Sequence, residues 1–335
     1  MRKLLVVAVL QALIASQGFA DFPSFPICTD AGDQEAPATD GRTIAWCDYR
    51  HEGMSIYAKD LSTGSQYPIC IGTGDSYAGR PSVDGNVVVW GDIRNGNRDL
   101  YAYRVTTGTE FPICVDSYHQ YYPFINGNLV VWEDGRGDFD IYGYDLITGT
   151  RFPICTQAEE QYAPCVDGNV VVYQDRRNEN RDIYGYSLAS NTEFAICRNP
   201  AEQWRPLIAG DIVVWRDQRN GSWDIYGFDL SSGTEFPICT AAGDQYLTGM
   251  SGDVLVWWDD RNGNWDIYGY DLSKGVEFPI CTDPLDQTAP KISGDLVVWT
   301  DYRNGSGDIY GAYVPEPVTF STFIVGLLLF RRRRT

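Results

Sequence analysis

The stretch "RNGNWDIYGYDLSKGVEFPIC", residues 261–281, decides the fold because the chain contains it more than once. A near copy, "RNGSWDIYGFDLSSGTEFPIC", occupies residues 219–239, and looser copies recur along the sequence. Self-similarity at a fixed period indicates an architecture that repeats one supersecondary unit. The repeat therefore overrides the two-domain organisation that 335 residues would ordinarily suggest.

Three landmarks fix the number of units. The cysteine that ends a "PIC" or "AIC" segment is Cys28, Cys70, Cys114, Cys155, Cys197, Cys239 and Cys281. The aromatic residue that ends a β-branched run is Trp46, Trp90, Trp132, Tyr173, Trp215, Trp257 and Trp299. The tyrosine of an "IY" or "LY" pair is Tyr57, Tyr101, Tyr142, Tyr184, Tyr226, Tyr268 and Tyr310. Each landmark occurs seven times, at intervals of 41 to 44 residues, so the chain contains seven units.

Each unit reads as four short strands. The last complete pattern offers "VEFPIC", "APKI", "DLVVW" and "DIYGAY", separated by turn residues, and no segment has the apolar period of a helix. Seven units of four antiparallel strands predict an all-β fold, a seven-bladed β-propeller. The chain starts with a lone fourth strand at residues 25–28 and stops after a third strand at Tyr313. We therefore expect the N-terminal strand to complete the last blade and close the ring.

The unit "GDLVVWTDYRNGSGDIYGAY", residues 294–313, resembles the WD40-like repeat of TolB-type propellers. The resemblance extends over nearly the whole chain between its two ends. It implies the propeller fold strongly and the function weakly, because that repeat serves periplasmic scaffolds, surface proteins and peptidase-associated propellers alike. No partner is carried over from it.

Both ends of the chain resemble processing signals. Residues 1–20 combine two basic residues, an apolar run and a small-residue "GFA" ending, which is typical of a secretory signal peptide. This assigns residues 21–313 to the propeller and residues 314–335 to a C-terminal tail. The tail contains Pro315, Glu316 and Pro317, then a hydrophobic stretch at 318–330 and four arginines at 331–334.

This order of parts resembles the PEP-CTERM sorting signal of exported bacterial proteins. The resemblance implies that Pro315, Glu316 and Pro317 form the sorting motif, and that an exosortase-type enzyme is a partner. It also implies export to the outer surface or extracellular matrix of a Gram-negative-type bacterium, with only transient membrane contact through the tail.

The net charge limits the classes of partner, and the cysteine positions indicate whether disulfides form. The formal net charge is −19, and without the two ends it becomes −24. Such an acidic body repels nucleic acid and anionic lipid, so neither is an expected partner. Seven of the nine cysteines occupy equivalent positions in different blades, too far apart for disulfides, so we expect buried free thiols.

A repeated Trp-x-Asp-x-Arg motif is followed by a further aspartate, as in Asp217, Arg219 and Asp224. An arginine between two carboxylates predicts a salt-bridge ladder along the blades. A calcium site is the alternative, because carboxylates and loop carbonyls are calcium ligands. We expect no other cofactor and no metal centre built on histidine.

No catalytic constellation emerges from the sequence. The two histidines, His51 and His119, fall in turns, and there is no nucleophile elbow or phosphate loop. We therefore expect a protein that is not an enzyme. A polysaccharide lyase or hydrolase that uses acids outside the repeat pattern is the remaining enzymatic alternative.

The residues that differ between units are the candidates for function. The loops entering the first strands and the turns between the second and third strands share one face, where a glutamine starts six of the seven units and an aromatic residue stands at the next position in five. The candidate ligand-binding residues are Gln120, Tyr121, Gln161, Tyr162, Gln203, Trp204, Gln245, Tyr246, Trp223, Trp265, Arg98 and Arg181. Such residues either pack against the next blade or form a platform for sugar rings.

The sequence thus predicts an exported, surface- or matrix-associated propeller that binds extracellular polysaccharide or a matrix or envelope protein. A protein–protein scaffold without a small ligand is the alternative.

Overall fold

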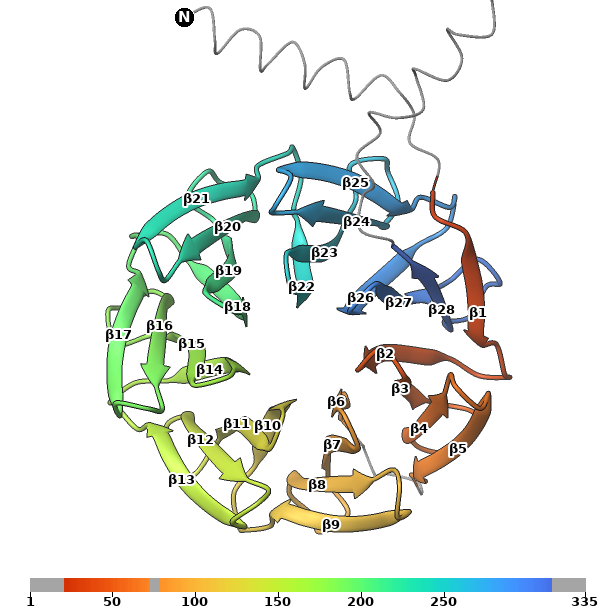
Figure 1. Cartoon of the computed structure of the whole chain (residues 1–335). Helices are drawn as coiled ribbons and strands as arrows, with labels where there is room; N and C mark the ends of the chain where they lie inside the picture. The colour runs from red at the N-terminus through yellow and green to blue at the C-terminus, as the bar shows by residue number, and fades with distance from the viewer. Residues whose placement is uncertain (1–20, 73–78, 315–335) are drawn as a thin grey trace, which may run out of the picture.

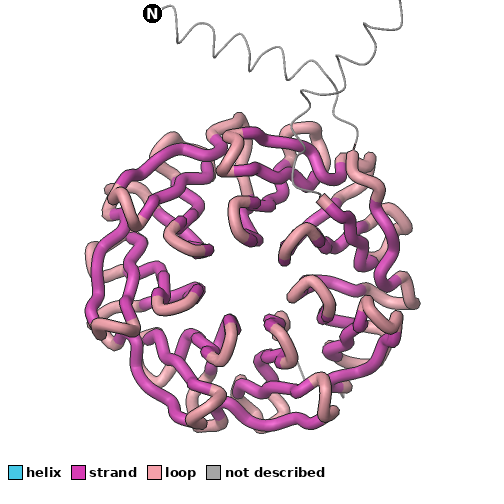
Figure 2. The backbone as a smooth tube through the Cα atoms, in the orientation of Figure 1, coloured by secondary structure: helices cyan, strands magenta, loops and turns pink. Residues whose placement is uncertain are grey.

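The computed structural model describes residues 21–72 and 79–314, and all regular structure in them is β-strand (Figures 1 and 2). Twenty-eight strands form seven four-stranded antiparallel sheets arranged as blades around a central axis. This confirms the prediction of a seven-bladed β-propeller. Among the described residues there is no helix that could span a membrane.

The blades are numbered in chain order from the first complete one. Blade 1 contains β2 (Gln34–Thr39), β3 (Thr43–Asp48), β4 (Ser55–Asp60) and β5 (Ser65–Cys70). Blade 2 contains β6 (Ser82–Asp84), β7 (Val87–Asp92), β8 (Asp99–Arg104) and β9 (Thr109–Cys114). Blade 3 contains β10 (Gln120–Asn126), β11 (Leu129–Asp134), β12 (Asp140–Asp145) and β13 (Thr150–Cys155). Blade 4 contains β14 (Gln161–Asp167), β15 (Val170–Asp175), β16 (Asp182–Ser187) and β17 (Thr192–Cys197).

The remaining three blades follow the same plan. Blade 5 contains β18 (Gln203–Ala209), β19 (Ile212–Asp217), β20 (Asp224–Asp229) and β21 (Thr234–Cys239). Blade 6 contains β22 (Tyr246–Ser251), β23 (Val254–Asp259), β24 (Asp266–Asp271) and β25 (Val276–Cys281). Blade 7 contains β26 (Gln287–Ser293), β27 (Leu296–Asp301), β28 (Asp308–Tyr313) and β1 (Ser24–Cys28).

The ring closes as the sequence predicts. Strand β1 pairs antiparallel with β28, with Ser24 opposite Ala312 and Phe25 opposite Gly311. The rings of Phe25 and Tyr313 stack with their centroids 5.5 Å apart. The last blade therefore combines both ends of the propeller, which pairs the outer edge that β28 would otherwise expose.

The core lies between adjacent blades. Along β7, Val88 and Trp90 pack into a cluster with blade 1, whereas Val87 and Val89 pack into a cluster with blade 3. This alternation follows from the two-residue period of a strand, whose successive side chains point to opposite faces. Because both faces of the second strand are covered, its residues form a continuous apolar run. Trp90 and its five tryptophan counterparts have no exposed surface.

The first strands surround the axis of the ring, as Figure 1 shows for β2, β6, β10, β14, β18, β22 and β26. Five of them contain a residue with positive φ two positions after the glutamine: Ala36, Tyr122, Ala163, Arg205 and Ala289, with φ between 47° and 51°. The pairing register with the second strand shifts at the same place. Such bulges bend the strand and re-aim the neighbouring side chains.

The predicted signal peptide and the sorting motif Pro315, Glu316 and Pro317 lie outside the described residues. Their assignment stays a prediction.

Candidate functional site

The repeated arginine motif holds neighbouring blades together. In blade 5, Arg219 Nε donates to Asp217 Oδ1 at 2.9 Å and Arg219 Nη2 to Asp217 Oδ2 at 2.6 Å. The indole of Trp215 donates to the same carboxylate at 2.9 Å, and Asp217 has no exposed surface. An equivalent arginine–aspartate pair occurs in all seven blades, at Asp48, Asp92, Asp134, Asp175, Asp217, Asp259 and Asp301.

Each of these arginines also contacts the blade before it. The Arg219 guanidinium lies 4.1 Å from the ring centroid of Tyr226 in its own blade, and its Nη2 lies 3.5 Å from Cys197 Sγ at the end of blade 4. Its Nη1 binds Glu235 on β21. These hydrogen bonds to carboxylates raise the pKa of Arg219 above its usual value, so its charge is fixed.

The predicted ladder is therefore present, but its second carboxylate is not the expected one. Asp224 accepts a hydrogen bond from Asn220 Nδ2 at 2.6 Å and from Ser222 Oγ at 3.1 Å. The aspartate of the third strand thus holds the turn that precedes it. The second carboxylate that pairs with the arginine comes from the fourth strand or from a loop.

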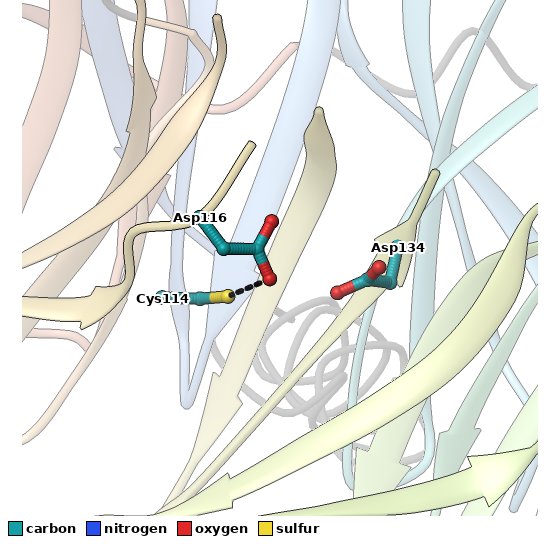
Figure 3. A group of neighbouring side chains, drawn as sticks. All are labelled: Cys114, Asp116 and Asp134. Atoms are coloured by element: carbon teal, nitrogen blue, oxygen red, sulfur yellow. Dashed lines mark hydrogen bonds between the residues drawn. The ribbon is translucent and has the colours of Figure 1, made fainter. Parts of the chain in front are cut away.

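Two groups of potential metal ligands occur among the described residues, and Figure 3 shows the first. It consists of Cys114, Asp116 and Asp134. Arg136 Nη2 donates to Asp116 Oδ2 at 3.0 Å, and Arg136 Nε donates to Asp134 Oδ1 at 2.8 Å. Arg151 Nη1 lies 3.1 Å from both Cys114 Sγ and Asp116 Oδ2. Two guanidinium groups thus already neutralise the carboxylates that a metal ion would need.

The second group, Cys281, Asp283 and Asp301, is neutralised in the same way. Arg303 Nη2 lies 2.6 Å from a carboxylate oxygen of Asp283 and 2.6 Å from one of Asp301. A cation here would have to displace an arginine that stays protonated in proteins. The arginines therefore already act as the counterions of these carboxylates, and the two groups favour them over calcium or manganese.

All nine cysteines are free thiols, and eight of them are buried. Burial raises the pKa of Cys47 and of Cys165 to about 12. A thiol with such a pKa has almost no thiolate at neutral pH and is a poor nucleophile. The cysteines therefore act as small core side chains, as the sequence predicts.

The face that carries the turns 218–223 and 260–265 and the loops 240–245 and 282–286, with their equivalents in the other blades, is called here the hairpin face. Four candidate glutamines stand at or directly before the start of the first strands at this face but have no exposed surface: Gln120, Gln161, Gln203 and Gln245. In Gln245, Nε2 donates to the carbonyl oxygens of Ala241 at 3.2 Å and Gly243 at 2.8 Å. The amide therefore holds the preceding loop beneath the surface.

The aromatic and arginine candidates come together across blade boundaries. The guanidinium of Arg98 in blade 2 lies 4.9 Å from the Tyr121 ring in blade 3, and Arg181 in blade 4 lies 4.9 Å from Trp204 in blade 5. Between blades 3 and 4, the rings of Phe139 and Tyr162 lie 5.2 Å apart. The turn residue of one blade thus contacts the aromatic residue of the next.

Blades 5 and 6 hold the densest aromatic group. Trp204 and Trp223 lie 5.2 Å apart within blade 5, and Tyr246 and Trp265 lie 5.3 Å apart within blade 6. Arg216 joins the two pairs, with its guanidinium 4.9 Å from Trp223 and 4.2 Å from Tyr246. The four aromatic residues are half-buried. They therefore pack against one another and against Arg216, and still present ring surface on the hairpin face.

Sequence reasoning missed the residue between Trp and Asp in the second strand. This position supplies Arg216, Trp258 and Glu133, and it lies opposite the aromatic residue of the first strand. Burial raises the pKa of Glu133 to about 7, although Ala163 N–H donates to it at 2.7 Å and Arg205 lies nearby. The pairing register of the first and second strands would have indicated this position, but a single sequence does not define that register.

No protein-family model and no curated protein matches this sequence. The fold is that of a seven-bladed propeller shared with several solved structures. An oligogalacturonate lyase from Vibrio parahaemolyticus superposes with a TM-score of 0.67 at 16% identity, covering 89% of this chain and 96% of that one.

Two other structures share the fold. A puromycin hydrolase gives a TM-score of 0.65 at 12% identity, covering 87% of this chain and 55% of that one. TolB from Acinetobacter baumannii gives 0.52 at 14% identity, covering 81% and 79%. At these identities the likeness shows the fold alone, and it supports the TolB-like resemblance at that level.

These neighbours correct the prediction that the protein is not an enzyme. A lyase and a hydrolase use the same fold, so the fold supports possible catalysis. The sequence contains no catalytic motif, and an acid outside the repeat pattern, which was the enzymatic alternative, belongs to no motif. Glu133 is a buried carboxyl outside the repeat pattern, and burial raises its pKa to about 7. A second oligogalacturonate lyase structure contains manganese, but the described acidic groups of this chain do not favour that ion.

Proposed function

We propose that this protein is an exported propeller of the cell surface or matrix that binds extracellular polysaccharide at its hairpin face. The observation that carries the proposal is the group formed by Trp204, Trp223, Tyr246 and Trp265, whose half-buried rings lie on one face. Flat aromatic rings suit the C–H faces of sugars, and exposed tryptophan without a ligand is costly to keep in water.

Two further points support the proposal. The repeat explains the arginine–aspartate pairs of every blade, but it does not explain why large aromatic residues gather at blades 3 to 6. One structural neighbour acts on an oligosaccharide, as its description as an oligogalacturonate lyase states. A sugar chain is therefore a ligand that this type of ring is able to accommodate.

The test is a glycan array that includes the producing cell's own exopolysaccharide, probed with the full-length protein. We expect specific binding that is lost in the double variant Trp223→Ala plus Trp265→Ala. Because these residues pack against neighbours, the double variant Trp223→Phe plus Trp265→Phe is run in parallel and should retain most binding. Ile147→Ala, an exposed apolar residue on a β12–β13 turn, is the matched control.

Circular dichroism of every variant shows whether it is folded. Specific protein binding without any glycan binding would favour the alternative, a protein scaffold comparable to TolB. The bound glycans are also assayed for new reducing ends, and Glu133→Gln shows whether any turnover depends on that acid.

The export part of the proposal rests on the two chain ends. We propose that an exosortase-type enzyme recognises Pro315, Glu316 and Pro317 and that the propeller then reaches the outer surface. Glu316→Ala is expected to leave the protein unprocessed in the membrane fraction. Normal processing of that variant would contradict the assignment.

A further inference from the structure

Three cations lie on the innermost strands of blades that are not adjacent to one another. Arg80 lies two residues before β6 in blade 2, Arg205 is in β18 of blade 5, and Lys291 is in β26 of blade 7. We call these three residues the axial cluster. None of the repeat landmarks includes them, and the described first strands of the other blades carry no cation at the same positions.

The charges of the axial cluster meet across the ring axis. Burial lowers the pKa of Lys291 to about 8, and the positive charges of Arg205 and Arg80 contribute to that lowering. Burial and the charge of Arg80 also lower the pKa of Arg205. The guanidinium of Arg205 lies 5.9 Å from the ring of Tyr122 in blade 3, and Tyr122 and Arg80 line one recess. Arg80 and Arg205 therefore approach each other from separate blades, and their charges also act on Lys291.

The axial cluster has little internal compensation. Within residues 21–72 and 79–314, none of its three members forms an ion pair, whereas eleven arginines of the same region do. Lys291 Nζ donates to the carbonyl oxygen of Thr248 at 2.5 Å, and the guanidinium of Arg205 lies 5.9 Å from the Tyr122 ring. Glu133 is the acid that faces Arg205, and burial raises its pKa to about 7.

A small recess adjoins the cluster. It has a volume of about 140 Å³ and is lined by Gly79, Arg80, Gly91, Arg98, Tyr122 and Pro123. Where blade 5 places Trp204 opposite Arg216, blade 2 places Gly79 beside Gly91, and neither glycine contributes a side chain. A Cβ on Gly91 would lie 3.0 Å from Cδ of Arg98. Glycine therefore leaves room for the arginine side chain at the wall of the recess.

The size of the recess indicates what it can hold. Sites for whole small molecules usually have volumes of about 300–1,000 Å³, so about 140 Å³ suits one charged group of a larger ligand. Tyr122 is 51% exposed and Arg80 is exposed, so the recess is reachable from solvent. Guanidinium groups bind carboxylate and sulfate oxygens through strong charge-assisted hydrogen bonds.

We propose that the axial cluster binds the anionic groups of an acidic glycan, carboxylates or sulfate esters, while its sugar rings lie on the hairpin face. This inference rests on the proposed function and specifies its ligand class. An anion brought between Arg80, Arg205 and Lys291 supplies the charge compensation that the described residues lack. In a chain of net charge −19, such a cluster is also the region where an acidic polymer is attracted instead of repelled.

The test measures dissociation constants of the full-length protein for matched charged and neutral glycans. Polygalacturonate is compared with its fully methyl-esterified form, and dextran sulfate is compared with dextran. We expect binding of at least one charged member, with an affinity at least about tenfold above its neutral partner and falling as salt concentration rises. The charged member that binds identifies the anion as carboxylate or sulfate.

Variants then place the binding at the cluster. Arg205→Ala and Lys291→Leu should each weaken binding of the charged glycan by about tenfold, a factor that equals about 1.4 kcal/mol. Both substitutions are compatible with the fold, because Ala163 and Leu207 occupy the corresponding positions of other blades. Arg104→Ala removes a cation from β8 outside the cluster and should leave the affinity unchanged.

The outcomes separate the two proposals. Equal binding of charged and neutral glycans, unaltered in Arg205→Ala and Lys291→Leu, would overturn the axial cluster as an anion site and leave the proposed function standing. Absence of binding to any glycan by folded protein would overturn both. Equal losses in Arg104→Ala and in the cluster variants would show a general charge effect and would also overturn this inference.

Discussion

The arginines of this propeller occupy two contrasting regions. In the outer ring of arginine–aspartate pairs, Arg219 lies against Asp217 and Glu235, and its pKa is raised. At the axis, Arg205 lies near Arg80, Tyr122 and Glu133, and burial and the charge of Arg80 lower its pKa. Arg219 is thus compensated at a position that the sequence repeats, whereas Arg205 forms no ion pair at a position where the sequence does not repeat. The repeated arginines stabilise the fold, and the exceptional ones are available to a ligand.

The largest expected effect is the difference in unfolding free energy between a variant of an outer arginine and a variant of an axial arginine. Arg219→Ala leaves the fully buried Asp217 without its counterion, which should cost about 3–5 kcal/mol of unfolding free energy. Arg205→Ala breaks no ion pair and places alanine where three other blades already have it at positive φ, so we expect a change within about 1 kcal/mol. Denaturant unfolding of both variants measures the difference. A similar loss in both would abolish the distinction between the regions.

The buried acid beside Arg205 should make stability depend on pH. Burial raises the pKa of Glu133 from 4.5 to about 7, so between these values the folded state binds more protons than the unfolded state. Its contribution to the unfolding free energy is therefore fully present below about pH 4.5 and falls as pH rises toward 7, by on the order of 3 kcal/mol.

Asp140 should act in the same direction, because burial raises its pKa to about 6. Glu133→Gln should consequently remove only part of the decline, which melting temperatures at pH 4.5, 6 and 8 would reveal. An unchanged pH profile in Glu133→Gln would show that this carboxyl has an ordinary pKa.

The buried glutamines should matter for stability and not for binding. Gln245→Ala removes two hydrogen bonds to loop carbonyls, which should cost about 1–3 kcal/mol. Its affinity for the glycan should stay within about twofold of the original when measured well below the melting temperature. A selective loss of affinity with unchanged stability would instead assign Gln245 to the ligand site.

The smallest expected effect concerns metals. Because Arg136, Arg151 and Arg303 already neutralise the two acidic groups, EDTA, calcium and manganese should each shift the melting temperature by less than about 1 °C. Differential scanning fluorimetry is sufficient for this comparison. A concentration-dependent rise with either ion, lost in Asp116→Asn, would contradict the counterion interpretation.

Most of the fold was predictable because the sequence repeats one four-stranded unit seven times. The positions of Cys197, Trp215 and Tyr226 within one unit fix four strands, and the lone strand at 25–28 fixes the closure. The site was predictable only in part. In the sequence, a glutamine next to an aromatic residue indicates an exposed binding residue. Gln245 is instead buried, because its amide donates hydrogen bonds to two carbonyl oxygens of the preceding loop.

The axial cluster was not predictable for a different reason. Arg80, Arg205 and Lys291 are 125 and 86 residues apart in sequence, and only ring closure makes them neighbours. The bulge that re-aims the first strand at Arg205 also lacks a sequence signal, since positive φ there is adopted without glycine.

The most direct test of the account is a crystal structure of the full-length protein with an acidic oligosaccharide. The account predicts sugar rings on the hairpin face near Trp204 and Trp223, with an anionic group within hydrogen-bond distance of Arg205. A ligand bound at the opposite face, or at the outer arginine–aspartate ring with the axial cluster empty, would contradict it.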